Sequence, residues 1–185
     1  MKSCLLAIPL ASIAIPLICI AISIALSPWF NITSNALSDL GHAINSKVSP
    51  IFNFGLSLGG TLIIVTAVTI IIRAGKPMAI STSVTGYTLI LVAVFDEVYN
   101  RYGKLHFWVS VAFFLSLATS LVIYSLITSN KIKRIMPLAL LAVGVALWIL
   151  HLFYKIPPGA AIPELISIFI IIPFYIDIVI KALKK

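Results

Sequence analysis

Long apolar stretches alternate with short polar breaks along the whole chain. A helix that crosses a hydrocarbon core of about 30 Å needs about 20 mostly apolar residues, and six stretches of the 185-residue sequence meet this length. We therefore predict an all-α, polytopic membrane protein, a six-helix bundle that forms a single transmembrane domain over residues 1–185. The predicted helices run from Leu5 to Ser27, Ile51 to Arg73, Ala79 to Val98, Leu105 to Thr128, Pro137 to Tyr154 and Ala160 to Ile180.

The longest polar break, residues 28–50, predicts a further short helix. Its two faces would hold Asn35, Ser38, Asp39 and His42 at positions i, i+3, i+4 and i+7, and Leu37, Leu40 and Ile44 on the other side. Such a helix would lie in the headgroup region and cap the bundle, with its polar face turned toward the helix ends.

The composition supports a membrane location. Hydrophobic residues make up 61% of the chain and charged residues 10%, whereas soluble proteins average roughly 45–50% and about 25%. These values exclude a soluble globular protein. The chain has no glutamine and much isoleucine, a composition typical of proteins from hot environments and compatible with an archaeal source.

The distribution of Lys and Arg predicts the orientation, because positively charged loops stay in the cytoplasm. Nine fall on one predicted side: Lys2, Arg73, Lys76, Lys131, Lys133, Arg134, Lys181, Lys184 and Lys185. Four fall on the other: Lys47, Arg101, Lys104 and Lys155. We expect a plasma-membrane protein with both termini cytoplasmic. The basic loops also account for the formal net charge of +8, because they are attracted to anionic membrane lipids. We therefore expect membrane lipids as partners and do not expect nucleic acid.

Acids and histidines gather on the predicted extracytoplasmic side. The acids there are Asp39, Asp96, Glu97 and Glu164, and the histidines are His42, His106 and His151. Asp177 alone lies at the cytoplasmic end, where Lys181 can pair with it at i+4. Because ionisable groups are costly at membrane depth, we predict a polar cluster of Asn35, Ser38, Asp39, Asp96, Glu97, His106 and Glu164 that opens outward.

Gly55 and Gly59 form a small-residue face on the second predicted helix. Such a face lets another helix approach closely. We expect the partner to be a helix of the same chain.

Several stretches of the sequence resemble one known family. They are Asn35-Ala-Leu-Ser-Asp-Leu-Gly41, Ile51-Phe-Asn-Phe-Gly-Leu-Ser-Leu-Gly59, Leu105-His-Phe-Trp-Val-Ser-Val-Ala-Phe-Phe114 and Ala161-Ile-Pro-Glu-Leu-Ile166. Together they resemble the bacterial and archaeal membrane family filed as domain of unknown function 998. The resemblance implies a six-helix membrane protein without an established activity, and its pattern includes Ser38, Asp39, His106 and Glu164.

The polar cluster supports several functional hypotheses. In the leading one it is a satisfied network, with Asp39 paired to His106 or Lys104, Glu164 capping a helix start, and Asp96 and Glu97 offset by Arg101. The protein would then bind a lipid or a membrane-protein partner through this outer vestibule.

The alternative is a metal-dependent intramembrane hydrolase of a lipid or lipid-linked substrate. His42, His106 and His151 would bind zinc or another divalent metal, and Asp39 or Glu164 would act as the general base. Ser38 with His42 is the one local candidate for a nucleophile and its base. A second alternative is a transporter, which needs a continuous polar path between Glu164 and Asp177.

Overall fold

The structure, a computed structural model, describes the backbone of residues 2–185 and the side chains of residues 6–185, so the side chain of Lys2 lies outside it. Within this part of the chain, six helices are long and apolar enough to cross a membrane and no strand occurs, which confirms the predicted fold class. The helices are α1 (Lys2–Ala25), α2 (Ser49–Thr69), α3 (Lys76–Val94), α4 (Leu105–Ile127), α5 (Lys131–Tyr154) and α6 (Ala161–Leu183). Short 3-10 helices are η1 (Leu37–Gly41), η2 (Ile71–Arg73) and η3 (Glu97–Arg101).

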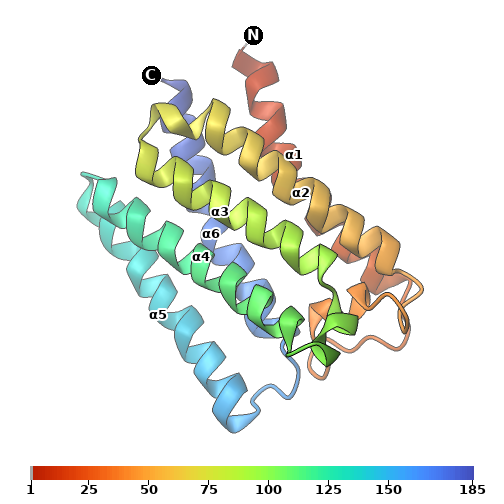
Figure 1. Ribbon diagram of the computed structural model, residues 1–185. Helices are drawn as coiled ribbons and strands as arrows, with labels where there is room; N and C mark the ends of the chain where they lie inside the picture. Colours follow the sequence, from red (N-terminus) through yellow and green to blue (C-terminus); the bar gives the residue numbers. More distant parts are fainter. Residues whose placement is uncertain (1) are drawn as a thin grey trace.

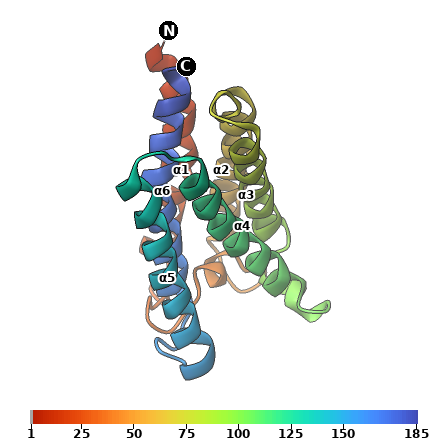
Figure 2. The same ribbon diagram turned by 90° about the vertical axis from the view of Figure 1, so that its left-hand side faces the viewer.

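Both chain termini lie at the same end of the bundle, as six crossings require (Figures 1 and 2). We call this the terminal end, and we call the opposite end, which holds η1 and η3, the loop end. α2 packs between α1 and α3, and α4 links α3 to α5 and α6. α5 is the least enclosed span: 11% of its apolar window is buried, against 50% for α3.

Glycines bring the first three helices close together. Gly55 and Gly59 of α2 face Cys19 and Pro16 of α1, where a Cβ atom would come within 2.3 and 2.8 Å of the opposing side chains. The predicted small-residue face therefore packs inside the chain, as expected.

Most predicted helix ends differ from the structure, and two of the differences have a clear physical cause. α3 stops at Val94 because Asp96, in an extended conformation, accepts a hydrogen bond from Val98 N at 2.8 Å and thereby begins η3. α5 begins at Lys131 and not at Pro137, because Asn130 caps it by accepting from Lys133 N at 3.1 Å.

The short helix in the first long loop exists, but it is the five-residue 3-10 helix η1. Leu37 and Leu40 are 4% and 0% exposed and point into the bundle core, whereas Ile44 is 68% exposed. The prediction that all three share one face was wrong, because the helix ends at Gly41 before it reaches Ile44.

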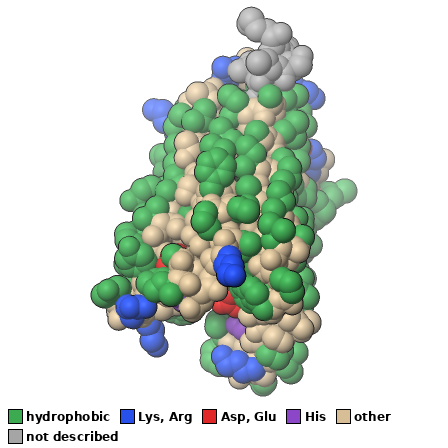
Figure 3. Space-filling model, turned by 90° about the vertical axis from the view of Figure 1, so that its right-hand side faces the viewer, with side chains coloured by type: hydrophobic (Ala, Val, Ile, Leu, Met, Phe, Trp, Pro, Cys, Tyr) green, Lys and Arg blue, Asp and Glu red, His purple; other side chains and the backbone are tan. Residues whose placement is uncertain are grey.

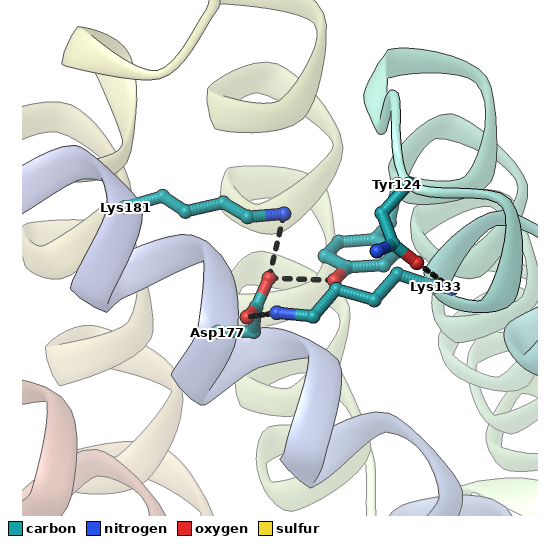
Figure 4. Close-up of polar contacts among 5 residues, drawn as sticks. Tyr124, Lys133, Asp177 and Lys181 are labelled. Carbon is teal, nitrogen blue, oxygen red and sulfur yellow. Dashed lines mark hydrogen bonds and ion pairs between the residues drawn. The ribbon is translucent and has the colours of Figure 1, made fainter.

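Asp177 joins three helices near the terminal end (Figure 4). Its carboxylate accepts from the Tyr124 hydroxyl of α4 at 2.6 Å, and it forms ion pairs with Lys133 of α5 and, at 2.7 Å, with Lys181 of α6. The predicted Asp177 and Lys181 pair is confirmed. These contacts hold the terminal end of α5 against its neighbours.

Candidate functional site

Glu164 lies in the first turn of α6 at the loop end and is 9% exposed. Its Oε2 atom accepts a hydrogen bond from Leu37 N at 2.6 Å. This carboxylate does cap a helix start, but the helix is η1 and not its own. The contact fixes the beginning of η1 against α6 across 127 residues of sequence.

Ser38 and Glu97 connect the two short helices of the loop end. The Ser38 hydroxyl of η1 donates to Glu97 Oε1 of η3 at 2.9 Å. Burial, followed by the charge of the nearby Asp39 carboxylate, raises the pKa of Glu97 from 4.5 to about 7. Glu97 therefore changes its charge close to neutral pH.

Asp39 and Asp96 hold the loop backbone. Asp39 Oδ2 accepts from Asn35 Nδ2 at 2.8 Å and from Ala36 N at 3.0 Å. Asp96 accepts from Val98 N and, at 3.2 Å, from Ala43 N. All of the hydrogen bonds that these two carboxylates accept come from uncharged donors.

The prediction that basic side chains form ion pairs with the acids of this cluster was wrong. Among the described side chains, both ion pairs involve Asp177, so Lys104 and Arg101 pair with none of the loop-end acids. Backbone N–H groups lie closer to these carboxylates than the flexible basic side chains do, and they need no side-chain ordering.

Two histidines stand on either side of this cluster. His106, at the start of α4, is 5% exposed, and its Nδ1 donates to the Phe95 carbonyl oxygen at 2.7 Å. Its Nε2 faces the Ser110 hydroxyl at 3.4 Å. His151 Nδ1, near the end of α5, donates to the Pro157 carbonyl oxygen at 2.9 Å. When a ring with Nδ1 as donor is uncharged, its Nε2 atom is a hydrogen-bond acceptor.

His42 takes no part in the expected nucleophile pair. Its Nδ1 accepts hydrogen bonds from the backbone N–H groups of Ile44 and Asn45, each at 3.3 Å. The Ser38 hydroxyl donates to Glu97 instead. His42 therefore is not placed to act as the general base for the Ser38 hydroxyl.

The three histidines do not share one metal site in this structure. In the part of the chain that the structure describes, no three His, Cys, Asp or Glu side chains are grouped so that they could hold one ion. His42, His106 and His151 lie on separate segments, and each ring is turned to a local backbone partner.

A cavity of about 460 Å³ opens between α4, α5 and α6 and reaches the loop end. Figure 3 shows acidic and histidine side chains in a hollow at this end of the molecule. The polar residues that line the cavity are Ser38, Glu97, Asn100, His106, Ser110, Trp148, His151, Glu164 and Ser167. Deeper in the bundle its walls are apolar and include Phe114, Leu117, Leu121, Leu141 and Ile170.

The structure thus divides the predicted cluster into two groups. Ser38, Glu97, His106 and Glu164 line the cavity, whereas Asn35, Asp39 and Asp96 support the loops behind them. His151 also lines the cavity and His42 does not.

Residues 10–177 match the model of the family described as protein of unknown function (DUF998). The chain belongs to this family. The predicted resemblance is confirmed over nearly the whole chain, and with the six apolar helices it defines a multi-pass integral membrane protein. Comparison with curated proteins gives no match, and comparison with solved structures gives none either.

Sequence reasoning missed four polar residues of the cavity in this DUF998 chain: Asn100 of η3 and three that lie within the long helices. Ser110 follows His106 by four positions, Trp148 precedes His151 by three, and Ser167 follows Glu164 by three. Trp148 Nε1 donates to Ser167 Oγ at 3.0 Å and so joins α5 to α6. Each of these three lies one helical turn deeper than a predicted residue, so helical spacing from the predicted residues was the signal that could have found them.

Proposed function

We propose that this protein binds a membrane lipid in the cavity between α4, α5 and α6. The lipid headgroup lies against the polar residues at the loop end, and its acyl chain lies along the apolar walls. The observation that carries this proposal is the combination of one apolar cavity with a polar mouth at a single end. Ligand sites are commonly cavities of about 300–1,000 Å³ with mostly apolar walls and a few convergent polar groups.

The loose packing of α5 supports a lipid over a protein partner. α5 is anchored near the terminal end by Lys133 and Asp177, and toward the loop end it borders the cavity through Gly144 and Trp148. A lipid can enter between helices from the bilayer, and the site beside α5 is a concave cavity and not a flat helix face. This shape favours one lipid molecule as the occupant.

The proposed orientation places the protein in the plasma membrane with both termini in the cytoplasm. It rests on the excess of Lys and Arg in the loops of the terminal end. The cavity mouth would then open to the extracytoplasmic leaflet.

Transport has less support than binding. The residues that line the deep part of the cavity, among them Leu121, Leu141 and Ile170, are apolar. They supply no polar path from Glu164 toward Asp177, which a transporter of polar solutes would need.

Filling the cavity tests the proposal. Gly144 lines the cavity, and a Cβ atom there would meet Ile170 Cδ1 at an ordinary 3.5 Å. We expect native mass spectrometry of protein purified in mild detergent to show one retained lipid for the wild type and for Gly144→Ala. Gly144→Leu should lose this lipid because its side chain occupies the cavity. A wild type that binds no added lipid, or a Gly144→Leu protein that binds as well as the wild type, contradicts the proposal.

A second measurement needs no change inside the cavity. Trp29 and Trp108 are 49% and 59% exposed, so Phe can replace both and leave Trp148 as the sole tryptophan. Titration in detergent with lipids brominated on the acyl chain should quench Trp148 fluorescence saturably, at one lipid per protein. Quenching that rises without saturation would identify nonspecific contact and overturn the proposed site.

A further inference from the structure

The charges around the cavity restrict the headgroup. Of the ionisable residues that line it, two are the carboxylic acids Glu97 and Glu164 and two are the histidines His106 and His151, and none of the lining residues is Lys or Arg. An anionic headgroup would meet carboxylates without a compensating cation. Burying a charge without a partner is costly, so a headgroup with a net negative charge fits this lining less well than one that also carries a cation.

Glu164 leaves one acceptor open. Its side chain is 9% exposed, and its Oε2 accepts from Leu37 N at 2.6 Å. Oε1 accepts no hydrogen bond from the described residues, although Glu164 lines the cavity. A carboxylate oxygen that faces a cavity and has no protein donor is free to accept a hydrogen bond from a bound molecule. A donor on the bound molecule would satisfy it.

The histidines add acceptors of the same kind. His106 and His151 each use Nδ1 to donate to a backbone carbonyl oxygen, so Nε2 of either ring, when the ring is uncharged, is an acceptor, and that of His106 already faces the Ser110 hydroxyl at 3.4 Å. The Ser38 hydroxyl already donates to Glu97. The mouth of the cavity therefore presents mainly acceptors, with negative charge among them.

We infer that the bound lipid carries a primary ammonium group in its headgroup, held by Glu164 and Glu97. This inference rests on the proposed lipid-binding function and specifies its ligand. An ammonium group supplies three N–H donors and one positive charge, and it forms charge-assisted hydrogen bonds with carboxylates. A quaternary ammonium group has the charge but no N–H to donate, so it satisfies Glu164 less well.

A competition among three lipids with identical acyl chains tests the inference. Phosphatidylethanolamine, phosphatidylcholine and phosphatidylglycerol are added at equal concentration to detergent-purified protein, and the bound species are counted by native mass spectrometry. We expect the ethanolamine lipid to exceed each of the others by about tenfold, the ratio that one charge-assisted hydrogen bond supports. Equal occupancy, or a preference for the glycerol lipid, overturns the ammonium assignment.

A long-chain amine separates the ammonium group from the rest of the headgroup. Octadecylamine carries no phosphate, and it should compete with phosphatidylethanolamine for the same site. Failure to compete overturns the ammonium as the recognised group. If none of the lipids or the amine binds, the proposed lipid-binding function itself is wrong, so the two failures are distinguishable.

Variants assign the selectivity to its residues. Glu164→Gln keeps an oxygen for Leu37 N and removes the charge, so it should still bind lipid but lose the tenfold preference. Glu97→Gln provides a second, independent variant with the same expected loss. Asp177→Asn, the same acid-to-amide change near the terminal end, should keep the preference. Unchanged selectivity in both Glu164→Gln and Glu97→Gln contradicts the inference.

Discussion

Glu97 is the residue whose surroundings give the protein a pH dependence near neutrality. Its carboxyl group has a folded-state pKa of about 7, against 4.5 when unperturbed, chiefly because of burial and secondly because of Asp39. The folded state therefore binds this proton more tightly than the unfolded state does, and the stabilisation from this group is complete below about pH 4.5. It is lost as the pH rises through 7, where the folded state must hold a buried charge.

We predict that the unfolding temperature in detergent falls between pH 5 and pH 8 for the wild type. Glu97→Gln removes the titrating proton and keeps an oxygen for the Ser38 hydroxyl, so its unfolding temperature should vary less over the same range. Asp39→Asn should shift the wild-type decline to lower pH, because the Asp39 charge raises the pKa of Glu97. Equal slopes in the wild type and Glu97→Gln contradict this account.

The types of residues and their expected depth in the membrane predicted which side chains lie at the loop end, but not which groups they form hydrogen bonds with. Glu164 and His106 were predictable because ionisable groups at helix ends in a membrane need a polar environment. The partner of Glu164 is the backbone of Leu37, and it depends on how η1 folds back over α6. Backbone N–H groups occur at every residue except proline, so no sequence signal distinguishes this donor from the others.

At the scale of helices, α2 and α3 approach each other backbone to backbone. A Cβ atom on Gly60 would come within 2.5 Å of the Gly86 carbonyl oxygen, and one on Gly86 within 2.5 Å of the Gly60 oxygen. Backbone atoms cannot move aside as a side-chain end can, so the helices must separate. We predict that Gly60→Ala or Gly86→Ala lowers the free energy of unfolding by about 1–3 kcal/mol, measured by thermal or denaturant unfolding in detergent.

Gly144→Ala is the matched control for this prediction. The added Cβ atom meets only Ile170 Cδ1, at 3.5 Å, so the same substitution on α5 should leave stability nearly unchanged. A loss at Gly144 equal to that at Gly60 would contradict this account, because helix propensity favours Ala over Gly at both positions and the close α2 to α3 contact would then not explain the loss.

Helix number and approximate position were predictable from apolar length, whereas helix ends were not. The predicted α5 began at Pro137 because Lys131, Lys133 and Arg134 are polar, yet these residues form its first turns. Long basic side chains can extend from a helix end to the membrane surface, and Lys133 also has Asp177 as a partner. The apolar pattern therefore predicts only the part of a helix that lies in the hydrocarbon core, and not its polar ends.

The charges of the whole molecule are divided between its two ends. Four of the five acids, Asp39, Asp96, Glu97 and Glu164, lie at the loop end, and Asp177 lies near the terminal end among basic residues. Nine of the thirteen Lys and Arg residues belong to the terminal end by sequence. We expect this distribution to orient the protein in the membrane, and the orientation would decide which leaflet supplies the proposed lipid.

Cysteine labelling on opposite ends tests the orientation. In a background with Cys4 and Cys19 replaced by Ala, Ile44→Cys marks the loop end and Ile132→Cys the terminal end, at sites that are 68% and 74% exposed. We predict that a membrane-impermeant maleimide labels Ile44→Cys in intact spheroplasts and labels Ile132→Cys only after permeabilisation, because the basic loops stay inside. The reverse pattern would place the cavity mouth at the cytoplasmic leaflet. The lipid competition would then have to be interpreted with the headgroups of that leaflet.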